Sequence, residues 1–65
     1  MQIGIEGITK FDYENTEIKA FALKGKGIFL FYMVDNGGGF ISLDAFTAKT
    51  YKSAKKQYLE MLDSM

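Results

Sequence analysis

The chain of 65 residues carries eight lysines against eight acidic residues, contains no cysteine or histidine, and is 15% aromatic. A single domain of this length buries only about 60% of its unfolded surface, and without cysteine or histidine neither a disulfide nor an ordinary zinc site can reinforce it. The balanced charge excludes a strong overall attraction to nucleic acid or to an anionic membrane.

Residues 2–13 alternate between apolar and polar side chains, which predicts a half-buried β-strand. Ile8 breaks this alternation. Gly7, directly before it, indicates either a bulge within one long bent strand or a turn between two shorter strands. The sequence alone leaves both alternatives open.

Two connections follow in the next part of the chain. Glu14-Asn15-Thr16 is typical of a turn. Residues 17–23 fit the period of a strand and also that of a short helix. The strand is favoured, because Lys24-Gly25-Lys26-Gly27 then forms a tight connection to the strand that follows.

The central feature of the sequence is a β-hairpin predicted between Gly27 and Phe46. Its two apolar runs are rich in aromatic and β-branched residues and flank the segment Asp35-Asn36-Gly37-Gly38-Gly39. The glycines accept positive φ at little steric cost, so this segment predicts a turn. It lacks the Gly-Lys-Ser/Thr ending of a phosphate-binding loop and the ligand spacing of a calcium loop.

The register of this hairpin depends on the length of its loop, because a slip of one residue turns every side chain of one strand to the other face. Both faces are too apolar for water, so the C-terminal helix must cover one face, and the N-terminal strands or a second chain the other. With a four-residue loop, one face holds Ile28, Leu30, Tyr32, Val34, Ile41, Leu43 and Ala45, and the opposite face holds Phe29, Phe31, Met33, Phe40, Ser42, Asp44 and Phe46. A five-residue loop recombines these two sets.

The last third of the chain changes to a helical period and predicts an amphipathic helix over residues 51–64. Thr50 is the expected N-cap and Thr47 the alternative. Leu59 flanks the apolar stripe and widens it. The stripe consists of Tyr51, Ala54, Tyr58, Met61, Leu62 and Met65. We therefore predict one α+β domain over residues 1–65, a small antiparallel sheet, either open or curled like an SH3 barrel, packed by one C-terminal helix.

The more aromatic face of the hairpin is the first candidate functional surface. Aromatic residues and methionine are enriched in interface cores, and large apolar patches rarely stay exposed on monomers. The alternative is that the N-terminal strands fold over this face. The predicted partner-binding residues are Phe29, Phe31, Met33, Phe40 and Phe46.

A lysine cluster at the start of the helix is the second candidate surface, and it consists of Lys49, Lys52, Lys55 and Lys56. These positive charges oppose the helix macrodipole, which favours acidic side chains at this end. The cluster indicates a nucleic-acid-binding patch as the alternative function. The structural alternative is a solvated helix face whose lysines maintain solubility.

No nucleophile–base spacing is recognisable, so we expect a protein without catalytic activity, cofactor or metal. No apolar run approaches the ~20 residues of a membrane span, and the start of the chain lacks the pattern of a signal peptide. We expect a soluble cytoplasmic protein. Its predicted function is that of a small interaction module, an inhibitor or adaptor, that binds a protein partner or itself as a homodimer.

Two families share parts of this pattern. The order strand, Gly-Lys-Gly, aromatic strand, Asp-Asn-Gly-Gly-Gly turn, strand and Ala-Lys-Lys-Gln-Tyr-Leu-Glu-Met-Leu-Asp helix resembles small chromatin proteins of thermophilic archaea. This resemblance implies an SH3-like barrel capped by a C-terminal helix and binding in the DNA minor groove. The comparable strands of this chain hold no arginine or tryptophan. The segment from Gly27 to Leu62 is similar to the arm-binding domain of tyrosine recombinases, which implies a three-stranded sheet plus a helix.

Overall fold

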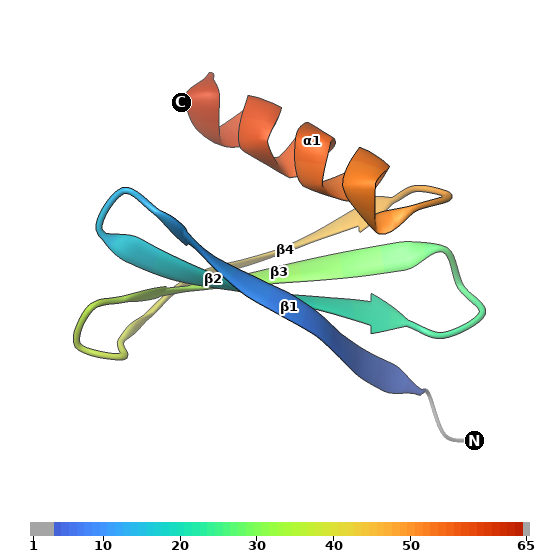
Figure 1. Ribbon diagram of the computed structural model, residues 1–65, viewed down its shortest axis with the longest axis horizontal. Coiled ribbons are helices and arrows are strands. Elements are labelled where there is room, and N and C mark those ends of the chain that lie inside the picture. Colours follow the sequence, from blue (N-terminus) through green and yellow to red (C-terminus); the bar gives the residue numbers. More distant parts are fainter. Residues whose placement is uncertain (1–3, 65) are drawn as a thin grey trace.

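The computed structural model describes residues 4–64 and contains one four-stranded antiparallel sheet with a helix on one of its faces (Figure 1). The elements are β1 (Ile5–Tyr13), β2 (Thr16–Leu23), β3 (Ile28–Asp35), β4 (Phe40–Thr47) and α1 (Tyr51–Asp63). The predicted α+β fold is confirmed. The strands follow one another in the order β1-β2-β3-β4, so β1 and β4 are the two edges and the sheet is open. This open sheet differs from a closed barrel and from a three-stranded sheet.

Strand β1 is one bent strand with a bulge, which decides between the two predicted alternatives. Gly7 pairs with Phe21 and Thr9 pairs with Ala20, so Ile8 is the extra residue between them. The bulge accounts for the break in the alternation, because the strand resumes its period of two on the other side of it. Residues 2 and 3 of the predicted strand lie outside the described residues.

The first two turns lie where the sequence predicts them. Glu14 has a φ of 54° in the turn between β1 and β2, and the Thr16 hydroxyl donates a hydrogen bond of 2.6 Å to the Tyr13 carbonyl oxygen. Gly25 and Gly27 have φ values of 76° and 64° between β2 and β3. These values favour glycine, since side chains with a Cβ rarely adopt them.

The turn between β3 and β4 is organised by the Asp35 carboxylate. One oxygen of this group accepts hydrogen bonds from the backbone N–H groups of Gly37 and Gly39, at 2.9 and 2.8 Å. A Cβ atom at Gly39 would lie 2.9 Å from the other carboxylate oxygen, so a larger residue here would push the carboxylate away from its hydrogen bonds. The predicted turn is confirmed, and its side-chain acceptor comes from the strand that precedes it.

A second bulge sets the register of the β3–β4 hairpin. Met33 pairs with Ser42 and Val34 pairs with Phe40, which leaves Ile41 as the extra residue. From the Ile28–Thr47 pair to the Met33–Ser42 pair, the register is the one expected for a four-residue loop. Phe40 is the exception, because the bulge turns it to the face opposite the one predicted. Its ring stacks there on Tyr32, with the centroids 5.6 Å apart.

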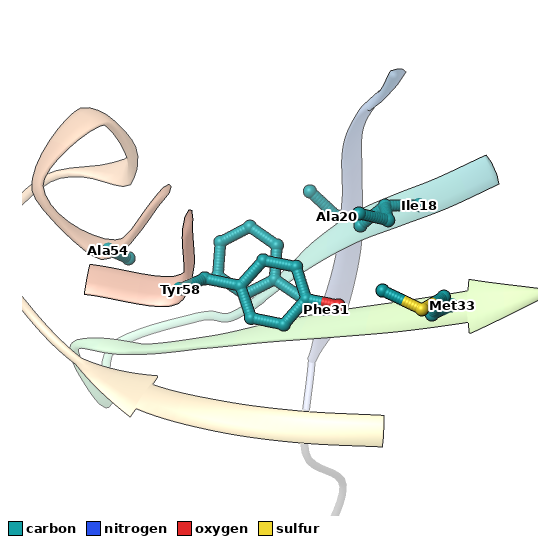
Figure 2. Close-up of a cluster of buried hydrophobic side chains, with 6 residues drawn as sticks. All are labelled: Ile18, Ala20, Phe31, Met33, Ala54 and Tyr58. Carbon is teal, nitrogen blue, oxygen red and sulfur yellow. The ribbon is translucent and has the colours of Figure 1, made fainter. Parts of the chain in front are cut away.

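The core lies between the sheet and α1, and its centre is a pair of stacked rings (Figure 2). Phe31 from β3 and Tyr58 from α1 lie 4.5 Å apart with an angle of 5° between their planes, and both side chains are fully buried. Thr50 caps the helix as predicted, since its hydroxyl oxygen accepts a hydrogen bond of 3.2 Å from the Ser53 N–H. The other buried residues of this core are Ile18, Ala20, Met33 and Ala54.

Replacing Phe31 by alanine is expected to unfold the domain. Loss of a buried phenylalanine costs about 3–5 kcal/mol, which equals the stability that one small core supplies. Tyr58→Phe is the matched control, because it keeps the stacked ring and removes a buried hydroxyl that has no hydrogen-bond partner among the described residues. We expect this variant to remain within about 1 kcal/mol of the parent. Urea unfolding followed by circular dichroism measures both, and a stably folded Phe31→Ala variant would contradict the central role of the stack.

Candidate functional site

The helix covers the aromatic face that the sequence favours as a binding surface. Phe31 and Met33 are buried beneath α1, and Phe29 and Phe46 are partly buried against the same core. Phe40 alone among the predicted partner-binding residues lies on the other face, with 63% of its surface exposed. Four of these five side chains therefore pack within the chain. The accessible face of the sheet is therefore the opposite one.

That opposite side has no covering element among residues 4–64 and is here named the open face (Figure 1). Cross-strand pairing arranges its side chains in rows that run from β1 to β4. The rows are Ile5, Leu23, Ile28 and Thr47; Gly7, Phe21, Leu30 and Ala45; Lys10, Lys19, Tyr32 and Leu43; and Asp12, Glu17, Val34 and Phe40.

The open face is apolar over most of its area. Among its large side chains Ile5, Phe40 and Leu43 are 62%, 63% and 55% exposed. Four strands about 4.8 Å apart, each about eight residues long with a rise of about 3.3 Å per residue, give this face a footprint of roughly 500 Å². Without the four charged side chains, the apolar part of this footprint lies within the range of the largest apolar patch on an ordinary monomer, about 300–600 Å². It approaches the area of about 800 Å² that each partner buries in a specific complex.

Charges occupy only one corner of the open face, and like charges stand opposite each other there. Lys10 pairs with Lys19, and Asp12 pairs with Glu17 in the adjacent row. Like charges directly opposite on a sheet are destabilising. Among residues 4–64 none of these four side chains forms an ion pair within the chain, where the one ion pair joins Lys24 to Glu6 at 3.5 Å on the surface. Along each strand, however, the sign alternates, because Lys10 is followed two residues later by Asp12 and Glu17 by Lys19 on the same face.

Only three of the four lysines in the predicted cluster are exposed to solvent. Lys49, Lys52 and Lys56 are exposed, whereas Lys55 is partly buried and its Nζ atom lies 4.3 Å from the centroid of the Phe11 ring. This cation–π contact attaches the helix to β1. On the outer side of α1, Lys52, Lys55 and Lys56 share a shallow hollow with Leu59 and with two acidic residues near the end of the helix, so acidic side chains lie close to this positive charge.

Two tyrosine hydroxyls are buried in the core without a hydrogen-bond partner among the described residues, those of Tyr51 and Tyr58. Burial raises the pKa of Tyr58, and the negative charge of Asp44 raises it further, together with Tyr13. The nearby Ser42 hydroxyl acts in the opposite direction, although the two hydroxyls do not meet the geometry of a hydrogen bond. Burial also raises the pKa of Tyr51.

These raised pKa values predict that the protein loses stability in alkaline solution. The folded state holds the phenolic protons more tightly than the unfolded state, whose tyrosines titrate near pH 10. The free energy of unfolding should be constant below about pH 9 and fall as the pH rises through 10. Urea unfolding between pH 7 and 11 measures this fall. The double variant Tyr51→Phe/Tyr58→Phe should show a shallower fall, and an identical pH profile would refute the assignment.

Residues 4–64 contain no group of three or more acidic, cysteine or histidine side chains that could share a metal ion. Within the same residues, no helix has the length and apolarity needed to cross a bilayer. Comparisons with protein-family models, with curated proteins and with solved structures found nothing that matches the chain. The candidate site therefore rests on the geometry of the open face.

Proposed function

We propose that this protein is a small non-enzymatic interaction module that associates with a second copy of itself through the open face. The observation that supports this proposal is the roughly 500 Å² of mostly apolar sheet that no element of residues 4–64 covers. Burying apolar surface contributes about 25 cal/mol per Å², whereas leaving it in water contributes nothing. An inhibitor or adaptor role would follow from the same surface.

A second copy is the occupant that the surface fits best. The open face combines apolar rows with equal numbers of positive and negative charges, two of each, so it can meet its own copy without net repulsion. Its footprint suffices for a small interface but not for a large permanent one. Association also costs about 4–15 kcal/mol in lost translational and rotational freedom. We therefore expect a dimer that dissociates on dilution.

Leu43→Lys is the variant that tests this proposal. Leu43 lies on an edge strand with 55% of its surface exposed, so a lysine there keeps its charge in water and leaves the core intact. We expect a folded monomer that no longer associates, because dimerisation would bury the new charge. Leu59→Lys on the outer side of α1 is the matched control and should dimerise like the parent.

Sedimentation equilibrium over a hundredfold range of concentration measures the association, and circular dichroism establishes that each variant is folded. A parent protein that stays monomeric throughout this range would refute the proposal. Equal dimerisation of Leu43→Lys and the parent would refute the assignment to the open face.

Nucleic-acid binding is the second candidate function, and three exposed lysines support it. Lys49, Lys52 and Lys56 form no ion pair among the described residues. Titration of a labelled duplex and a labelled single strand at low salt tests this candidate. We expect the log–log slope of affinity against salt to fall by about one for each phosphate contact that is lost in Lys52→Ala or Lys56→Ala. No binding at low salt would eliminate the candidate.

A further inference from the structure

We infer that the outer edge of β4 pairs antiparallel with the same edge of a second copy, about a two-fold axis at Leu43. This contact goes beyond the proposed function, because it uses the edge of the sheet and leaves the open face free to make its own contact. It joins the four strands of each copy into one continuous sheet. The two open faces then lie side by side on the same surface.

The backbone of β4 presents hydrogen-bonding groups along its outer edge. The Ala48 N–H donates to the Gly27 carbonyl oxygen at 2.9 Å, which fixes the residues of β4 whose backbone points toward β3. In an antiparallel ladder, hydrogen-bonded pairs alternate with pairs that exchange no bonds. The N–H and C=O groups that point outward are therefore those of Leu43, Ala45 and Thr47.

The helix occupies only one end of this outer edge. Gln57 Nε2 donates to the Thr47 carbonyl oxygen at 3.5 Å, which agrees with the outward direction of that group. Among residues 4–64 no other strand pairs with this side of β4. The outward groups of Leu43 and Ala45 are thus available to a further strand.

The two edges of the sheet differ in their protection against pairing. Charged side chains, proline and bulges commonly block an exposed edge. Strand β1 carries Lys10 and Asp12, and the bulge at Ile8 interrupts it. The bulge of β4 lies at its loop end, so the segment from Ser42 to Thr47 is regular, and Asp44 is its one charged residue. The edge of β4 is therefore the better template for an added strand.

Asp44 distinguishes among the self-pairing registers that bring outward groups together. It is half-buried on the helix side of β4 and forms no ion pair with another described residue. An axis at Asp44 would place two carboxylates opposite each other, and an axis at Ala45 would place Asp44 opposite Phe46 of the second copy. An axis at Leu43 places Asp44 opposite Ser42 of the second copy, whose hydroxyl can donate to the carboxylate. Symmetry supplies this favourable pair twice.

The course of α1 leaves room for a second copy at Leu43. The helix starts near the end of β4 and runs toward β1, where the Tyr13 hydroxyl donates to the Asp63 carboxylate at 3.1 Å (Figure 1). The inferred register places Thr47 of each copy beside Gly39 of the other. The starts of the two helices therefore lie at opposite ends of the paired strands.

A second copy also gives the open face the area that it lacks alone. Three of the five large apolar side chains that are exposed lie on β4, namely Phe40, Ile41 and Leu43. Edge pairing brings both sets together, with Leu43 beside Leu43 of the second copy. The two open faces have a combined footprint of roughly 1,000 Å². This exceeds the area of about 800 Å² that each partner buries in a specific complex. The contact closes on itself, because both edges that remain are β1.

Single cysteines test the register, because the chain itself contains none. The Cα atoms of a hydrogen-bonded antiparallel pair lie about 5.5 Å apart, within the range of about 4.4–6.8 Å for a disulfide. Leu43→Cys should therefore form a disulfide-linked dimer on oxidation with diamide. Ala45→Cys is the matched control, because the inferred register separates its two copies by about 13 Å along the strands. Non-reducing electrophoresis measures the cross-link, and cross-linking of Ala45→Cys in place of Leu43→Cys would refute the register.

Proline at Leu43 tests the backbone hydrogen bonds. The Leu43 N–H points away from β3, so Leu43→Pro leaves the ladder between β3 and β4 intact, and edge strands accept proline in this orientation. We expect edge association at least tenfold weaker than in the parent. Leu43→Ala is the matched control, because it keeps the N–H and should retain the contact. Sedimentation equilibrium measures association and circular dichroism measures folding. If Leu43→Pro is unfolded, the cysteine pair decides.

Ile5→Lys separates the edge contact from the proposed function. Ile5 is 62% exposed on β1, so a lysine there opposes burial of the open face and leaves the edge of β4 unchanged. Leu43→Lys does not separate them, because like charges would also meet at the axis.

Each outcome has a distinct meaning. If Leu43→Pro associates like the parent, the edge contact is refuted and the open face is unaffected. If Leu43→Pro is monomeric while Leu43→Ala and Ile5→Lys dimerise, the edge contact stands and association through the open face is refuted. A parent that forms four-copy assemblies, which each of Leu43→Pro and Ile5→Lys reduces to dimers, supports both. A parent that is monomeric at every concentration refutes both.

Discussion

The stacking of Phe31 on Tyr58 is the contact on which the rest of the structure depends. It joins the middle of β3 to the middle of α1 and lies where side chains from β2 also converge. Because the helix can cover only one side of the sheet, this contact decides which side becomes the core. The other side remains uncovered among the described residues, and its composition then becomes the main evidence about function.

Two bulges decide which side chains reach the open face. Ile8 and Ile41 are the extra residues in the edge strands β1 and β4. Each shifts the strand register by one residue, so that the side chains beyond it point to the other face of the sheet. Without the bulge in β4, Phe40 would lie on the helix side of the sheet. Without the bulge in β1, Glu6 and Ile8 would lie on the open face in place of Ile5 and Gly7. The open face is thus a product of pairing register as much as of composition.

The open face combines two properties that act differently. Its apolar rows supply a driving force for association that has no direction, since burial of apolar area is favourable against any apolar partner. The charged corner supplies direction, because a mismatch leaves charges without water or a partner. Specific interfaces use such mismatch costs as well as favourable contacts. The proposed dimer would therefore bury the apolar rows, and the four charged side chains would limit which arrangements of the two copies are tolerated.

The local elements of this protein were predictable from the sequence, whereas the identity of its open face was not. The strands, the turn at Asp35 and the cap at Thr50 depend on neighbouring residues, whose preferences the sequence displays directly. Residues Ile28 to Val34 are apolar on both faces of β3, so no pattern within them indicates which face meets the helix. Only the fit between α1 and the aromatic side of the sheet decided this, because burial depends on the shape of surfaces that meet after the chain has folded.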